Sequence, residues 1–169
     1  MGGTIAQKLA VNHPDQLGKL ILLATSSKWR KAIELAFHSQ IGAREAEVSE
    51  EVLFEMKWPW VFGEKFLSDT KKFEKFKKLY FASPFPQSLK DQKRQLQILD
   101  RFDGRKDLKN IQAETLVLYG KEDLLSLPYE SKYIAEKIPN AKIKSMDAAH
   151  GVNTEAPEAL VQEMLTFFK

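Results

Sequence analysis

The sequence TLVLYGKED at residues 115–123 decides the fold: a run of apolar and β-branched residues stops at a glycine and passes into a short acidic turn. A continuous apolar run of this length is typical of a strand buried on both faces, as in a parallel sheet. A second such run, KLILLA, occupies residues 19–24. A third, AKIKSM at residues 141–146, alternates polar and apolar residues and is therefore predicted to be an edge strand.

Helices are predicted around these strands. Small and apolar residues at 2–10 suit a helix packed tightly on a sheet, and Asn-His-Pro at residues 12–14 ends it. A proline introduces a helix over residues 129–138, and a last helix starts after residue 153. Strands and helices that alternate with short connections predict an α/β fold with a parallel sheet and right-handed crossovers.

The segment between the first two strands predicts helices only. Its amphipathic stretches are residues 29–40, 48–57, 70–81 and 87–102. A helical insertion of this kind usually forms a lid or cap over a sheet. We therefore expect residues 1–28 and 108–169 to form an α/β core and residues 29–107 to form a helical cap.

Length and composition exclude several classes of protein. The 169 residues correspond to one ordinary domain or a piece of a larger one, and 43% hydrophobic with 29% charged residues excludes disordered and fibrous chains. The net charge of +3 comes from scattered lysines. The densest basic stretch, residues 71–78, has phenylalanines at helical spacing, so it is interpreted as the solvated face of a helix, and no nucleic-acid partner is expected.

The absence of cysteine excludes disulfides, thiolate metal sites and a cysteine nucleophile. No apolar run approaches the roughly 20 residues of a membrane span, and residues 1–20 lack the charged-then-apolar order of a signal peptide. We therefore expect a cytoplasmic protein without a membrane partner. His13 and His38 are predicted to be structural or surface residues, and because no two histidines have ligand spacing, no metal site is expected.

The candidate catalytic residues are Asp123 and His150, each in a loop that follows a predicted strand. Loops at the carboxyl ends of parallel strands converge on one crevice, so the two side chains are expected to meet despite a separation of 150 − 123 = 27 residues. Either residue alone is more often structural. Together, a carboxylate that holds an imidazole in one tautomer is two thirds of a triad that activates a nucleophile.

The opening MGGTIAQKLA, residues 1–10, resembles the segment that follows the nucleophile elbow of α/β-hydrolases, whose partners come in the order Ser, Asp, His. The resemblance continues along the chain in HPDQL and LILL at residues 13–17 and 20–23, in IQAETLVLYGKED at residues 111–123, and in AHG and EAPE at residues 149–151 and 155–158. It implies a partial α/β-hydrolase fold with the last three parallel strands, flanking helices and an inserted helical cap.

The resemblance also implies site residues. Asp123 takes the place of the orienting acid and His150 that of the general base, while Met1 stands at the oxyanion-hole position, where the family uses a backbone N–H and this chain has a free amine. No G-x-S-x-G occurs in the sequence, so the nucleophile serine is missing and the chain alone is expected to be inactive. The simplest expectation is a truncated chain that starts one residue after that serine.

Two functions remain open. In the first, the chain is the carboxyl-terminal part of a serine hydrolase of the esterase type, which acts without a cofactor on a small ester, lactone or related carbonyl substrate. In the second, it is a non-catalytic remnant that binds a small ligand or another protein. Residues 20–24 would expose an unpaired strand edge, which predicts self-association or pairing with a separate amino-terminal piece.

The aromatic residues of the predicted cap also leave two alternatives. They either line an apolar pocket above the triad or form the core of the cap itself, and the second is favoured because a small helical layer needs large residues to bury enough area. These residues are Trp58, Trp60, Phe62 and Phe66.

Overall fold

The chain is built around one three-stranded sheet, which is parallel throughout and has the strand order β1-β2-β3 in the computed structural model. The structure describes residues 1–169. The strands are β1 (Lys19–Leu23), β2 (Glu114–Gly120) and β3 (Ala141–Met146). These are the three predicted strands, and the α/β fold class predicted from them is confirmed.

Strand β2 is central and is buried on both faces, as its apolar run predicts. Val117 faces one hydrophobic cluster, whereas Leu116 and Leu118 face the other. In β1 the outcome differs from the prediction, because only Leu20 and Leu22 are buried and the other three residues of the strand are half-buried. The difference arises because β1 lies at one edge of the sheet.

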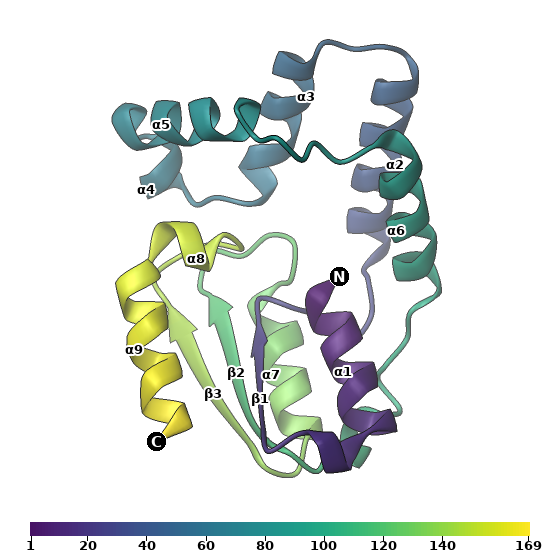
Figure 1. Cartoon of the computed structure of the whole chain (residues 1–169), viewed down its shortest axis with the longest axis vertical. Coiled ribbons are helices and arrows are strands. Elements are labelled where there is room, and N and C mark those ends of the chain that lie inside the picture. The colour runs from purple at the N-terminus through teal and green to yellow at the C-terminus, as the bar shows by residue number, and fades with distance from the viewer.

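Helices cover both faces of the sheet (Figure 1). Helices α1 (Gly2–Asn12) and α7 (Pro128–Lys137) contribute to the cluster on one face, and α8 (Val152–Glu155) and α9 (Pro157–Phe168) contribute to the cluster on the other. Single 3-10 turns lie at Pro14–Gln16, Trp58–Trp60 and Leu108–Asn110. None of the helices combines the length and the apolar character that crossing a membrane requires.

Five further helices lie between β1 and β2, at the end of the sheet toward which the strands point (Figure 1). They are α2 (Lys31–Glu45), α3 (Glu50–Lys57), α4 (Glu64–Leu67), α5 (Thr70–Phe81) and α6 (Leu89–Arg101). Side chains one residue before α3, α5 and α6 accept a hydrogen bond from the first turn, which explains where these helices begin. Helix α2 runs five residues beyond its predicted end, and the single turn α4 was not predicted.

The two ends of this helical segment lie side by side. Lys28 and Asp103 form an antiparallel bridge, and the backbone N–H of Gly104 donates to the carbonyl oxygen of Ser27 at 2.8 Å. The chain therefore leaves the sheet layer and returns to it at one point, as an insertion does. The division into a core and a cap, with the boundaries given above, stays a prediction.

Aromatic side chains form a third hydrophobic cluster, separate from the two that flank the sheet. Trp58 stacks on Phe62 with ring centroids 5.2 Å apart, and Phe62 in turn lies 4.4 Å from Phe66. Of the two alternatives for these residues, the structure therefore places Trp58, Phe62 and Phe66 in a core of the helical segment. Trp60 is exposed and is outside this cluster.

A pair of leucines tests this assignment of the sheet core. Leu118→Ala removes a side chain that is 0% exposed, so it should lower the free energy of unfolding by about 2–5 kcal/mol. The control Leu165→Ala, at a position in α9 that is 55% exposed, should change that free energy by less than about 0.5 kcal/mol. Urea unfolding followed by circular dichroism measures both values, and equal losses would contradict the assignment.

Candidate active site

The structure brings Asp123 and His150 together, as the sequence predicts. Asp123 lies in the turn after β2 and His150 in the loop after β3, and Nδ1 of the imidazole is 2.9 Å from Oδ2 of the carboxylate. The Asp123 side chain is fully buried, whereas the His150 side chain is 30% exposed. The pair therefore has a buried acid behind a histidine that faces outward.

Backbone donors hold the Asp123 carboxylate in place. Its Oδ1 accepts hydrogen bonds from the N–H groups of Leu125 and Ser126, both at 2.8 Å. Only Oδ2 then remains for the histidine, and because a carboxylate accepts hydrogen bonds, Nδ1 must be the protonated nitrogen. This arrangement leaves Nε2 of His150 with a lone pair that can take a proton from a nucleophile.

The two loops that carry this pair are joined through their backbones. The N–H groups of Lys121 and Glu122 donate to the carbonyl oxygens of Met146 and Ala148, at 3.0 and 3.1 Å. At Gly120 the contact is closer still, since a Cβ there would lie 1.9 Å from the carbonyl oxygen of Ala149. Glycine is therefore required at the end of β2, because any side chain would separate the acid from the histidine.

Glu155 in α8 links the histidine loop to the helical segment above it. Its Oε1 accepts a hydrogen bond from the N–H of Ala149, and its Oε2 accepts one from the N–H of Gly63, both at 3.0 Å. Beside it, the N–H of Gly151 donates to the carbonyl oxygen of Val61 at 2.9 Å. The loop with His150 is thus held from both sides, by the turn after β2 and by the segment above.

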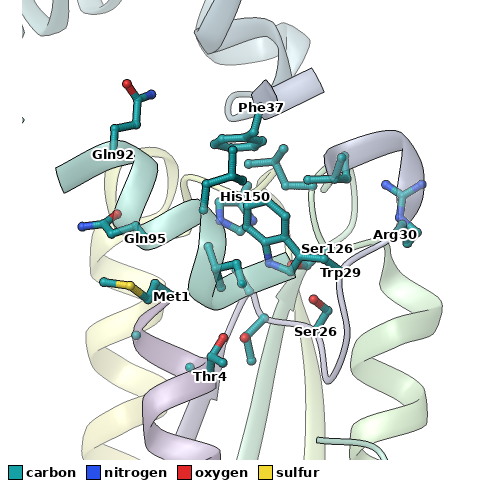
Figure 2. A pocket seen from close by; sticks show the side chains of 18 of the residues that line it. Met1, Thr4, Ser26, Trp29, Arg30, Phe37, Gln92, Gln95, Ser126 and His150 are labelled. Atoms are coloured by element: carbon teal, nitrogen blue, oxygen red, sulfur yellow. The ribbon is translucent and has the colours of Figure 1, made fainter. Parts of the chain in front are cut away.

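A cavity of about 390 Å³ opens in front of His150 (Figure 2). Its walls come from the start of α1, the loop after β1, helices α2 and α6, and the acidic loop. Trp29 and Phe37, whose ring centroids are 5.1 Å apart, form an aromatic wall beside the histidine. Further apolar wall residues are Leu23, Ile33, Ile41, Leu96, Leu99 and Leu125.

Met1, the predicted oxyanion-hole position, also lines this cavity (Figure 2). It is the residue at the amino-terminal cap of α1, and its carbonyl oxygen accepts hydrogen bonds from Thr4 and Ile5. Helix α1 therefore directs its amino terminus, with its partial positive charge and free N–H groups, toward the space in front of His150. Such an end stabilises negative charge on a bound oxygen.

A second charged pair supports the acidic loop from outside. Arg30 donates from Nη2 to the carbonyl oxygen of Leu124 at 2.7 Å, and its Nε is 3.5 Å from Oε2 of Glu130. Glu130 also accepts a hydrogen bond from the N–H of Leu127 at 2.8 Å. Burial of this carboxylate raises the pKa of Glu130. Arg30 thereby ties the loop that follows Asp123 to the start of α2.

Sequence reasoning missed most of the cavity wall. Ser26 and Ser126 are buried wall residues, and no sequence pattern singles them out. The spacing of Ile33, Phe37 and Ile41 marks one face of α2, but the amphipathic pattern alone does not say what that face covers. His38 lies on another face, where it pairs with Asp100 at 2.9 Å. No group of three or more His, Asp and Glu side chains is arranged to hold a metal ion.

Comparisons with known proteins come from sequence and from structure. The model of a family described as alpha/beta hydrolase fold matches residues 1–157. A protein of Caulobacter sp. strain K31, assigned as the carbamate hydrolase RutD, is 28% identical over 98% of this chain and 62% of its own length. A Mycobacterium tuberculosis protein assigned as the non-heme bromoperoxidase BpoC is 25% identical over 99% of this chain and 65% of its own length.

Two solved structures have the same fold. An alpha/beta hydrolase enzyme from a Medee basin deep-sea metagenome library has a TM-score of 0.89 at 23% identity, over 99% of this chain and 62% of that one. The enol-lactonase from Burkholderia xenovorans LB400 has a TM-score of 0.86 at 20% identity, over 99% of this chain and 62% of that one. The chain spans 62–65% of the length of the two curated relatives described above.

Gly120→Ala tests whether the contact between the two loops positions the pair. A Cβ would clash with the carbonyl oxygens of Ala149 and Ala148, so the variant should lose about 1–3 kcal/mol of stability and the hydrogen bond from His150 to Asp123. Gly18→Ala is the control, since nothing lies within 4 Å of a Cβ there. Thermal unfolding reports the stability, and the proton NMR signal of the His150 Nδ1–H reports the bond. An unchanged signal in the Gly120 variant would contradict the argument.

Proposed function

The chain belongs to the α/β-hydrolase family, and from this we propose that it carries the acid and the base of a hydrolase that cleaves a small ester, lactone or related carbonyl compound with a serine nucleophile. The observation that carries the proposal is the pair of Asp123 and His150, with Nδ1 and Oδ2 2.9 Å apart and the histidine on the wall of a cavity. His150 acts as general base, and Asp123 orients its ring and stabilises the imidazolium.

The nucleophile of the whole protein is, in this proposal, a serine directly before Met1. Residues 1–10 resemble the segment that follows the nucleophile elbow of the family, and α1 holds Met1 on the wall of the same cavity as His150. A serine next to Met1 would stand at the carboxyl end of the sheet, where the start of α1 lies (Figure 1).

The reaction then passes every proton through one nitrogen, twice in forming the acyl-serine and twice in hydrolysing it. Nε2 of His150 takes the serine proton as Oγ attacks the carbonyl carbon, and the oxyanion that forms accepts a hydrogen bond from the N–H of Met1. The imidazolium returns its proton to the departing alkoxide, which leaves an acyl-serine. Water repeats the sequence, with His150 as base and then as acid, and releases the acid product and the serine.

The cavity supports a small substrate. Its volume of about 390 Å³ is within the usual range of small-molecule sites, and the aromatic wall of Trp29 and Phe37 suits an apolar acyl or ring moiety. Two of the similar proteins described above, a carbamate hydrolase and an enol-lactonase, have names of the same reaction class, whereas the name bromoperoxidase is of another. In reactions of the first class an activated nucleophile attacks a carbonyl carbon.

The outer edge of β1 is the surface for which we propose a protein partner. Within this chain, β1 pairs only with β2, so the backbone groups on its other side are free to extend the sheet. The partner is a further strand, from an amino-terminal piece or from a second copy of the chain. Pairing of this kind would continue the parallel sheet of the family.

Hydrolysis of p-nitrophenyl butyrate tests the proposed roles. In the protein extended by its upstream coding sequence, His150→Ala and Asp123→Asn should each lower kcat about 10³–10⁴-fold, because the base or the correct tautomer is lost. The matched control is His38→Ala, since His38 also pairs with an aspartate at 2.9 Å but lies outside the cavity, and its kcat should stay unchanged.

The same assay separates the alternatives. If the 169-residue chain alone hydrolyses the ester and depends on His150, the nucleophile lies within the chain, and the cavity serines Ser26 and Ser126 become the candidates. If neither form hydrolyses the ester, the proposal is wrong and a non-catalytic, ligand-binding or protein-binding role is favoured.

A further inference from the structure

A second hollow of about 500 Å³ adjoins the cavity in front of His150. It lies among the helices above the sheet, between α2, α3, the end of α5 and α6. The two hollows share four wall residues, so they meet at a common boundary. These shared residues are Gln40, Lys57, Gln87 and Gln92. A ligand held by His150 could therefore extend toward this boundary.

Lys57, at the end of α3, is a cation on this boundary without a carboxylate partner. Its Nζ lies over the rings of Trp58 and Tyr80, 4.6 and 5.6 Å from their centroids, and forms no ion pair. Burial first, and then the charge of Arg44, lower the pKa of Lys57. The two rings stabilise this partly buried ammonium group, and an anion between it and the guanidinium group would stabilise it further.

Arg44 is held in place by other groups. Its Nη1 donates to Oε1 of Gln92 at 2.9 Å and to the carbonyl oxygen of Gln87 at 3.2 Å, while Nη2 is 3.8 Å from Oε1 of Glu50. Glu50 offsets the charge of Arg44, which leaves one uncompensated positive charge, that of Lys57. A single charge matches a carboxylate better than a phosphate, which carries nearly two negative charges at neutral pH.

An amide without a hydrogen-bond partner in the protein lies at the same boundary. Gln40 is 7% exposed, lines both hollows, and its side chain makes no hydrogen bond within the protein. The amide atoms of Gln40 are not among the fully buried polar atoms without a partner, so they are open to the hollows and free to bind a ligand group or water. The amide nitrogen of Gln40 and the ammonium group of Lys57 can both donate to a carboxylate.

We propose that the boundary formed by Gln40 and Lys57 binds a carboxylate on the substrate, so that the preferred substrates are esters or lactones that carry a second, negatively charged carboxylate group. The inference rests on the proposed hydrolase function and names its substrate class. The carbonyl that reacts lies at His150, and the free carboxylate lies at Lys57, both on the wall of the same cavity. Apolar wall residues of the cavity would contact the part of the substrate that connects the reacting carbonyl to the free carboxylate.

A matched pair of esters tests this inference in the whole protein that contains the chain. The p-nitrophenyl monoester of glutarate bears a carboxylate where p-nitrophenyl pentanoate has a methyl group. We expect kcat/KM for the glutarate monoester to exceed that for the pentanoate about ten-fold, and Lys57→Met to remove most of this ratio. Lys57→Arg should restore part of it, because the charge returns.

Lys77→Met is the control for Lys57→Met. Lys77 is also a cap lysine over an aromatic ring, with Nζ 5.5 Å from the Phe54 centroid, but it lines neither hollow. Its ratio of the two kcat/KM values should equal that of the unchanged protein. A ratio that is close to one in the unchanged protein, or that survives Lys57→Met, would overturn the inference and leave the hydrolase function standing. If neither ester is hydrolysed, the hydrolase proposal and this inference fall together.

A binding measurement keeps the test decisive if the Lys57 variants do not fold. In the unchanged protein, glutarate should change the tryptophan fluorescence, because the Lys57 ammonium group lies 4.6 Å from the Trp58 ring. The uncharged diamide, glutaramide, should have a much smaller effect at equal concentration. Equal responses to the two compounds would count against a carboxylate site.

Discussion

The close approach of two loops at the end of the sheet is the constraint on which the candidate site depends. Parallel pairing of β2 with β3 places both carboxyl ends at one edge, and the absence of a side chain at Gly120 lets the loop with His150 lie against the turn with Asp123. The hydrogen bond between them at 2.9 Å is a consequence of this backbone contact. Burial of Asp123 is tolerated because each of its carboxylate oxygens has a donor.

The helical segment contributes in two separate ways. Its aromatic cluster around Phe54 gives it a core of its own, and Glu155 connects the turn at Gly63 to the histidine loop through one carboxylate. Meanwhile α2 and α6 supply much of the cavity wall. The sheet edge therefore holds the groups that would perform the chemistry, while the helices above it shape the space that a substrate would fill.

Charged side chains near the sheet edge differ in their pairing from those in the helical segment. Near the sheet edge, Arg30 and Glu130 form a neighbouring pair that supports the acidic loop. In the helical segment, Lys57 has no acidic partner, although Arg44 beside it has Glu50. An uncompensated cation in a partly buried position is costly for folding. Lys57 and Gln40 line the same two hollows, which is why we propose a ligand carboxylate there.

The sequence by itself determined the strands, most of the helix positions and the meeting of Asp123 with His150. Those features follow from local patterns: apolar runs, capping residues, and the rule that parallel strands end at a common edge. Its resemblance to α/β-hydrolases agrees with the family match over residues 1–157. Only the tertiary structure decided which aromatic residues form a core and which line a cavity, and that Gln40, Lys57 and His150 share one wall. These outcomes depend on how each helix is rotated and on contacts between residues up to about a hundred positions apart, which periodicity along one helix does not encode.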